Sequence, residues 1–230
     1  MHLPRLFKRR PHKKSQEGRL AALLDHHGIR SVIDVGANAG QTYDRLRGLG
    51  FSGKVVSIEP ISRLQQQLSE RAKTERNWTV LPPMALSNRE GTTELLVSEA
   101  DDLSSLRAPV PDLNAALPRA AEVARETVKL QTLDALWPTF DVDAGSTLLK
   151  LDAQGSEAEI LEGASTVLPT LCAILVELSL VPLYEGEADY LTICSTLHKA
   201  GFVPVLFIPG YFSRNIKRQL QMDGFFVRRP

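Results

Sequence analysis

The sequence predicts an α/β fold built on a doubly wound, mostly parallel sheet whose last strand is antiparallel. Three observations support this expectation. Apolar runs of strand length alternate with segments that have helical spacing of apolar residues. A stretch with shorter alternating strands interrupts this order after the third run, which indicates a small β insertion. The final two runs have no helix between them, and their short connection favours an antiparallel pair.

Strand and helix alternate regularly in the first third of the chain. A helix is predicted over residues 16–28, with leucines on one face and Gly28 as its stop signal. Gly50 is a similar stop for a later helix, and Ser62 is placed to cap the next one. The predicted strands cover residues 31–37 and 54–60 and lie within 78–87, while the helices cover residues 40–50 and 62–74.

Residues 88–131 form the predicted insertion between the third and fourth core strands. Two short alternating strands at 92–97 and 126–131 flank an irregular stretch rich in Pro, Ser and Asp. The sheet then resumes with strands at 147–155 and 173–180, helices at 156–168 and near 188–200, and closing strands at 202–210 and 223–230. Ser156 and Glu159 match the S-x-x-E spacing of a helix capping box.

The 230 residues suffice for one substantial domain, predicted over residues 16–230 after a basic flexible tail at 1–15. Residues 1–14 carry six Lys and Arg and no acid, although the whole chain has a formal net charge of zero. This tail is either disordered and solvated or in contact with anionic lipid. The charge pattern does not indicate nucleic-acid binding, and the oligomeric state stays open.

The cellular compartment that we expect for the protein follows from its cysteines and from its N-terminus. Cys172 and Cys194 lie in apolar surroundings and do not form a disulfide framework. No apolar run is long enough to span a bilayer, and the basic N-terminus lacks the features of a signal peptide. We therefore expect a cytoplasmic protein, either free or peripheral at the inner face of the membrane.

Polar residues gather at the predicted carboxyl ends of the strands, where open parallel sheets bind their ligands. The first strand ends in "DVGANAG", whose G-x-x-x-G spacing over Gly36 and Gly40 differs from the G-x-G-x-x-G of dinucleotide sites. The following helix N-terminus favours an anion such as a carboxylate. Glu59 ends the second strand and suits a ribose diol. A ribose and a carboxylate without a pyrophosphate indicate S-adenosylmethionine. The alternatives are a tight turn with a helix cap, and an NAD-type oxidoreductase, which the glycine spacing disfavours.

Several segments in this order resemble the FkbM family of S-adenosylmethionine-dependent methyltransferases, from about residue 17 to the C-terminus. They are "VIDVGANAGQ", "SIEP", "MALSNREG", "VKLQTLDAL", "LLKLDAQGSEAEILEGA" and "VELSLVPLYEG". The resemblance implies a class I methyltransferase fold, which is Rossmann-like, and O-methylation of a sugar, glycolipid or polysaccharide hydroxyl, or alternatively of a polyketide-like small molecule. The implied donor contacts are Asp34, Gly36, Ala37, Asn38, Gly40, Gln41, Glu59, Pro60, Ala85, Leu86 and Ser87. Asn88 stands where the family often has Asp, so an adenine contact there is less secure.

Methyl transfer to a hydroxyl needs a base or a metal, because a sugar hydroxyl is a poor nucleophile at neutral pH. Asp152 at the end of the fourth strand is the first candidate, and Glu177 and Glu157 are the others. The expected acceptor contacts are Gln154, Tyr184, Ser104 and Ser105, the last two on an insertion that lids the site.

Each of these assignments has an alternative. Asp152 could be only a structural anchor, and the helix dipole by itself explains Glu157. Asp152 and Glu177 could hold Mg²⁺, which we disfavour because no third ligand is evident. A catalytically silent module that keeps the cofactor-binding fold is the remaining alternative.

Overall fold

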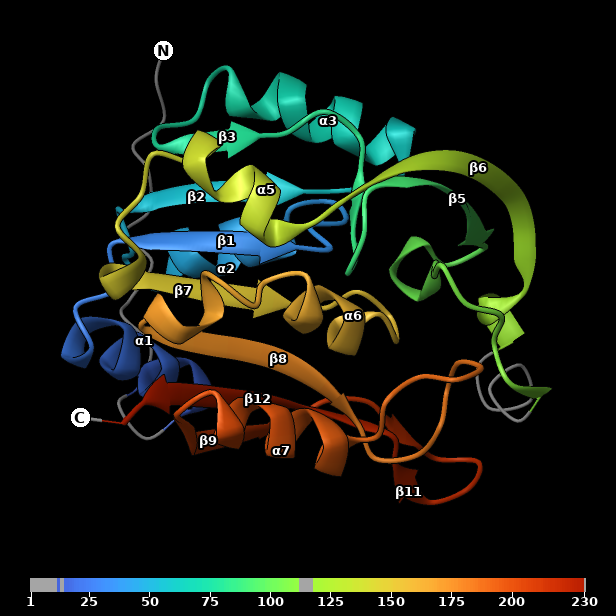
Figure 1. Cartoon of the computed structure of the whole chain (residues 1–230). Helices are drawn as coiled ribbons and strands as arrows, with labels where there is room; N and C mark the ends of the chain where they lie inside the picture. Colours follow the sequence, from blue (N-terminus) through green and yellow to red (C-terminus); the bar gives the residue numbers. More distant parts are fainter. Residues whose placement is uncertain (1–11, 13–14, 112–117, 230) are drawn as a thin grey trace, which may run out of the picture.

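The computed structural model describes residues 12, 15–111 and 118–229 of the chain. Its centre is a seven-stranded sheet in the order β3-β2-β1-β7-β8-β12-β9 (Figure 1). The strands are β1 (Ser31–Val35), β2 (Lys54–Ile58), β3 (Trp78–Val80), β7 (Thr147–Leu151), β8 (Ala173–Ser179), β9 (Phe202–Pro209) and β12 (Gln221–Arg228). β12 runs antiparallel to both of its neighbours, and the other pairings in this sheet are parallel. The predicted doubly wound sheet with an antiparallel last strand is confirmed.

Helices pack on both faces of this sheet. The main ones are α1 (Gln16–His26), α2 (Gln41–Gly48), α3 (Ser62–Ala72), α6 (Glu157–Glu162) and α7 (Tyr190–Lys199), with a short α5 (Leu133–Leu136). One buried cluster joins leucines of α1 and α2 to the sheet, and a second joins residues of α6 and α7 to the other face. Every residue of β1 and β7 is buried, as expected for central strands covered on both sides.

The helix after β7 is shorter than predicted. α6 ends at Glu162, and the Gly163 that follows lies close to another segment, since a Cβ there would be 2.1 Å from the carbonyl oxygen of Ser87. The predicted capping box is wrong. The Ser156 side chain makes no capping hydrogen bond, and the Glu159 carboxylate pairs with Arg107 instead. Tertiary contacts therefore replace the local bonds that this spacing predicts.

The two strands of the insertion pair with each other and with a short strand that precedes them, in a three-stranded sheet of the order β4-β6-β5. Its strands are β4 (Ala85–Leu86), β5 (Gly91–Ser98) and β6 (Glu122–Gln131), and the last two are longer than the sequence predicts. In Figure 1 β5 and β6 arch away from the central sheet, on the side where β1, β2 and β7 end. Beyond β9, a small hairpin of β10 (Phe212–Ser213) and β11 (Arg218–Gln219) was not predicted.

Of the predicted basic tail, only His12 and Ser15 belong to the described residues. Ser15 caps α1, because its hydroxyl accepts a hydrogen bond from the Gly18 amide at 3.1 Å. In the described part of the chain, no helix combines the length and apolar character that crossing a bilayer requires.

Candidate active site

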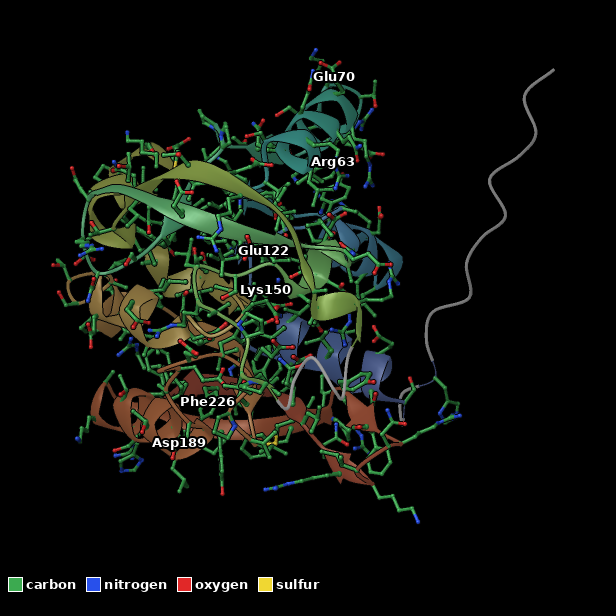
Figure 2. The ribbon with its side chains drawn as sticks, turned by 90° about the vertical axis from the view of Figure 1, so that its right-hand side faces the viewer. Arg63, Glu70, Glu122, Lys150, Asp189 and Phe226 are labelled. Atoms are coloured by element: carbon green, nitrogen blue, oxygen red, sulfur yellow. The ribbon has the colours of Figure 1, made fainter. Side chains whose placement is uncertain are left out.

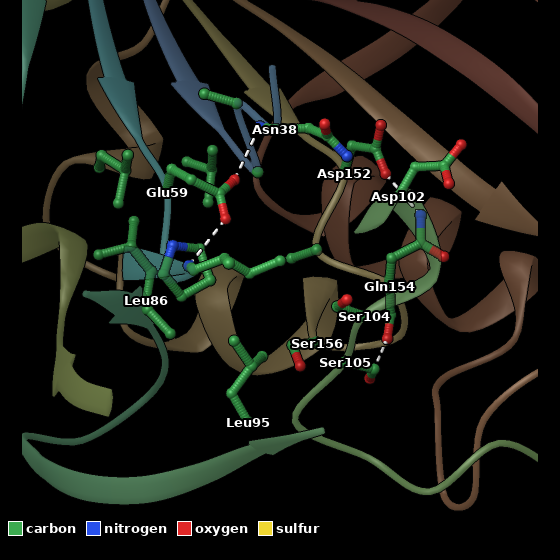
Figure 3. Close-up of a pocket in the computed structure, with 18 of the residues that line it drawn as sticks. Asn38, Glu59, Leu86, Leu95, Asp102, Ser104, Ser105, Asp152, Gln154 and Ser156 are labelled. Carbon is green, nitrogen blue, oxygen red and sulfur yellow. Dashed lines mark hydrogen bonds between the residues drawn. The ribbon is translucent and has the colours of Figure 1, made fainter. Parts of the chain in front are cut away.

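A cavity of about 290 Å³ opens at the carboxyl ends of β1, β2 and β7. This volume is near the lower end of the ~300–1,000 Å³ that is usual for small-molecule sites. Asp101, Asp102, Ser104, Ser105 and Leu106 of the insertion also line it. Figure 3 shows Leu86 and Leu95 on one side and Asp152, Gln154 and Asp102 on the other. The cavity therefore combines an apolar wall with a polar, acidic one.

The turn after β1 depends on glycine at two positions, for reasons of packing. Gly36 has a φ of 74°, and a Cβ there would lie 1.8 Å from the carbonyl oxygen of Asp152. Gly40 has a φ of 91°, and its Cβ would approach the Arg71 guanidinium at 2.8 Å. Both glycines let protein segments approach each other, so the tight turn is fixed by its neighbours as well as by any ligand.

Glu59 connects the end of β2 to this turn. Its two carboxylate oxygens accept hydrogen bonds from the amides of Asn38 (2.7 Å) and Ile61 (2.8 Å). Only 3% of the residue is exposed, and burial raises the pKa of its carboxyl group to about 7, against the lowering effect of the two amides. Each oxygen keeps a second lone pair, which is able to accept a further hydrogen bond from a ligand hydroxyl.

Lys150 is a buried cation between the first and fourth core strands. Its ammonium group lies 3.2 Å from the Asp34 carboxylate and 3.6 Å from that of Asp152. It also donates to the carbonyl oxygens of Val35 and Gly36. Burial alone would lower the pKa of Lys150, but Asp34 and Asp152 outweigh that effect and raise it. The ammonium thus holds the β1 turn and the end of β7 together as a charged unit.

Gln154 lies between two carboxylates beside the cavity. Its side-chain amide donates to Asp152 Oδ1 at 2.7 Å and to Glu177 Oε2 at 2.9 Å. Its oxygen Oε1 lies 2.8 Å from the hydroxyl of the buried Tyr184, which donates to it. With both amide hydrogens on carboxylates, this orientation of the side chain satisfies all of its polar groups. Burial raises the pKa of Glu177, and the neighbouring acids, first of all Asp152, add to that effect.

Glu157 forms hydrogen bonds with the backbone of the loop between β7 and α6. Its oxygens accept hydrogen bonds from the amides of Ala153 (2.7 Å) and Gly155 (3.0 Å), and only 7% of the residue is exposed. Burial raises the pKa of its carboxyl group to about 7. The side chain therefore folds back on the loop that carries Asp152 and Gln154 and does not line the cavity.

The insertion is fastened to the core beside the cavity. The Ser105 hydroxyl donates to the Gln154 carbonyl oxygen at 2.6 Å, while Ser104 accepts from the Ser98 amide at 3.0 Å within the insertion itself. Arg107 pairs with Glu159 of α6 and donates to the carbonyl oxygen of Glu185 at 2.9 Å. These bonds hold residues 104–107 over the end of β7.

The cavity brings together most of the residues that the sequence singles out. Those that line it are Gly36, Ala37, Asn38, Gln41, Glu59, Pro60, Ala85, Leu86, Ser104, Ser105, Asp152 and Gln154. Asp34, Gly40, Ser87, Glu157, Glu177 and Tyr184 stand behind this lining, within the network that supports it. Asp34 in particular is fully buried and faces Lys150 and the Ser57 hydroxyl.

Three charged residues of the lining, Lys150, Asp101 and Asp102, were not predicted from the sequence. Lys150 was a detectable signal, since it lies two positions before Asp152 and a lone lysine in the apolar strand "TLLKL" needs a buried partner. Asp102 lines the cavity from the insertion and is exposed. Its irregular segment has no periodicity from which its direction could be predicted.

A magnesium site is not supported by the described residues. No group of three or more His, Cys, Asp and Glu residues is arranged among them to hold a metal ion. Asp152 and Glu177 both accept hydrogen bonds from the Gln154 amide, so a side-chain donor already bridges the proposed ligand pair.

Solved structures of other proteins have a similar fold. A candidate S-adenosylmethionine-dependent methyltransferase from Listeria monocytogenes has a similar structure, with a TM-score of 0.50 and 11% identity over 93% of this chain and 97% of that one. A candidate tRNA (m1A22) methyltransferase from Streptococcus pneumoniae, in complex with S-adenosylmethionine, has a TM-score of 0.49 and 12% identity over 91% and 72% of the two chains. No curated protein sequence matches the chain.

The family is shown by the sequence itself. Residues 34–204, well over half of the chain, match the methyltransferase FkbM domain. Together with the class I methyltransferase fold of the Listeria structure, this match supports an S-adenosylmethionine-dependent methyltransferase. The chain belongs to the FkbM family of methyltransferases.

Proposed function

We propose that the chain transfers the methyl group of S-adenosylmethionine to a hydroxyl of a sugar, glycolipid or polysaccharide, with Asp152 as the general base. The observation that carries the proposal is the position of Asp152. It is the one of the three predicted catalytic acids that lines the cavity, and 38% of its side chain is exposed. A polyketide-like hydroxyl is the second acceptor class.

The residues of the cavity fit this donor. Glu59 keeps free lone pairs for the hydroxyls of a ribose. Ile61, Met84 and Leu86 offer an apolar surface for the adenine ring of the donor. When bound, S-adenosylmethionine supplies a methyl group made electrophilic by its sulfonium charge. The acids Glu59, Asp101, Asp102 and Asp152 outnumber the single cation Lys150 in the lining, which favours a positively charged group electrostatically.

Asp152 would accept the proton of the acceptor hydroxyl as the oxygen attacks the methyl carbon. Gln154 and Lys150 restrict the carboxylate from two sides, so the side chain is held at the cavity wall before the acceptor arrives. Such positioning is the main contribution that a protein makes to an in-line displacement. Glu157 keeps the loop in place and Glu177 anchors Gln154, so both act as positioning residues.

The test compares donor binding with transfer in matched variants. Calorimetry with S-adenosylhomocysteine is expected to show binding that Asp152→Asn leaves within about threefold, while transfer of radiolabelled methyl to glycan, lipid or small-molecule extracts falls on the order of 100-fold or more. Asp141→Asn, at an exposed aspartate far from the cavity lining, is the control.

Two outcomes would contradict the proposal. Absence of S-adenosylhomocysteine binding at millimolar ligand would exclude S-adenosylmethionine as the methyl donor. A fluorescence change in an NADH titration would then favour the oxidoreductase. Wild-type transfer by the Asp152→Asn variant removes Asp152 as the base. Donor binding without transfer to any extract would favour the catalytically silent module.

A further inference from the structure

The hairpin formed by residues 211–218 exposes an unusual combination of side chains. Tyr211, Phe212 and Ile216 are 42%, 50% and 56% exposed, and they belong to the small set of large apolar residues on the surface. Arg214, Lys217 and Arg218 of the same hairpin are also exposed. We call these six side chains the 211–218 surface.

The 211–218 surface lies on the same side of the central sheet as the cavity, where the parallel strands have their carboxyl ends. β9 runs parallel to β1 and β7, so it ends at the edge where they end, and the hairpin connects it there to β12. Figure 1 shows β11 at this edge below the insertion. Figure 2 looks onto the edge, with Lys150 near its middle and the last strands at its lower side.

The charge of this region has one sign. Between Asp189 and Asp223 the sequence has no acidic residue, whereas it has four Lys and Arg, three of them in the hairpin. The cations of the hairpin form no ion pair with an acid in the described residues. A docking site that bound its partner through apolar contacts alone would not need this excess of unpaired positive charge.

Exposed apolar side chains together with unpaired cations are what an anionic bilayer surface binds. Aromatic rings and aliphatic side chains enter the interface, and Lys and Arg remain near the headgroup phosphates. Ile216, the most exposed of the three apolar residues, has no ring for stacking on a nucleic-acid base, which favours lipid over single-stranded RNA.

We propose that the 211–218 surface docks on an anionic lipid bilayer. Docking through it would place the edge of the sheet that carries the cavity next to the membrane. This inference goes beyond the proposed function and does not rest on it, because it concerns a separate surface whose occupant is recognised by its charge and apolar character.

Vesicle sedimentation of the full chain tests the proposal, with phosphatidylcholine vesicles that contain or lack phosphatidylglycerol. Binding is expected only to the anionic vesicles and is expected to weaken as salt rises. Arg214→Gln/Lys217→Gln/Arg218→Gln is expected to reduce partitioning about 100-fold at low salt, at roughly fivefold per charge. Phe212→Ser/Ile216→Ser is expected to reduce it about tenfold through lost apolar burial.

Matched controls carry the same substitutions elsewhere on the surface. Arg76→Gln/Arg89→Gln/Lys129→Gln removes three other exposed cations, and Val123→Ser replaces another apolar side chain, which is 62% exposed. Both controls are expected to partition within about twofold of wild type, since the surface potential acts within about a Debye length of ~10 Å. All variants retain the basic residues 1–14, so any contribution from that segment is constant.

Three results would overturn the proposal. The hairpin variants could partition as their controls do. The wild-type chain could be a dimer in solution that Phe212→Ser/Ile216→Ser converts to a monomer, which would assign the surface to a second copy. The chain could bind single-stranded RNA through the same residues while showing no affinity for anionic vesicles.

Discussion

Gly36 lies directly against the main chain of Asp152, since a Cβ added to Gly36 would stand 1.8 Å from the Asp152 carbonyl oxygen. The turn that begins the donor site and the strand end that carries the proposed base are therefore in backbone contact. The Asp152 amide also donates to the Val35 carbonyl oxygen at 3.2 Å. A shift of one segment would displace the other, so this contact would couple the proposed donor and acceptor positions.

Gly36→Ala is expected to weaken binding of the proposed methyl donor. The added methyl group would collide with a backbone atom that cannot move without displacing Asp152, and alanine is disfavoured at a φ of 74°. S-adenosylhomocysteine affinity, measured by calorimetry, should fall at least about tenfold, with a loss of stability above the ~1–2 kcal/mol of the backbone conformation alone.

Gly28→Ala is the matched control for this substitution. Gly28 also has a positive φ, of 60°, but nothing lies within 4 Å of the position that a Cβ would take there. Its variant should therefore show only the conformational cost and unchanged donor affinity. Equal effects at the two glycines would mean that the contact with Asp152 is unimportant.

Lys150→Met is expected to lower the free energy of unfolding by about 3–5 kcal/mol, because it leaves the fully buried Asp34 carboxylate without its cation. Urea denaturation measures this loss, and the double variant Asp34→Asn/Lys150→Met should recover most of it. Lys73→Met, which removes an exposed pairing with Glu70 at 2.6 Å, should cost about 1 kcal/mol or less. A double variant as unstable as the single one would contradict a direct pairing.

Stability should fall as the pH rises from about 5 to about 7. Burial raises the pKa of both Glu59 and Glu157 to about 7, so in this window the folded chain keeps protons that the unfolded chain has released. Each carboxyl group should lower the free energy of unfolding by about 2 kcal/mol between about pH 5.5 and about pH 7.5.

The quantity to measure is the difference in the free energy of unfolding between about pH 5.5 and about pH 7.5. The free energy at a single pH is not sufficient, because Glu157→Gln also removes a hydrogen bond from the loop. Urea denaturation at both pH values should give a difference about 2 kcal/mol smaller in Glu157→Gln than in wild type. The exposed Glu90→Gln variant should keep the wild-type difference. A difference that Glu157→Gln leaves intact would show that this carboxyl group does not retain its proton on folding.

Much of the fold could be predicted from local patterns. The apolar runs ending at Val35, Ile58 and Leu151 indicated β1, β2 and β7, and the missing helix before β12 indicated its antiparallel direction. The position of Glu59 at the end of β2 also followed from strand order, since parallel strands end at one edge.

What could not be predicted depends on contacts between distant segments. Glu159 has the spacing of a capping residue, but Arg107, far away in sequence, takes its carboxylate. Glu157, Glu177 and Asp152 are indistinguishable in sequence as acids near strand ends, and only burial separates the two positioning residues from the one that reaches the cavity. The strands β5 and β6 extend each other by pairing beyond their alternating stretches.

Asp34 and Lys150 are direct neighbours across the paired strands β1 and β7, and this position has a consequence for how the sheet assembles. The two strands, "SVIDV" and "TLLKL", are otherwise almost uniformly apolar, so many alignments would bury similar surface. A slip of one residue would turn Lys150 to the opposite face and leave Asp34 beside a leucine. The ion pair thus favours one register of β1 and β7 over the others. That register places Asp152 against the turn that follows β1.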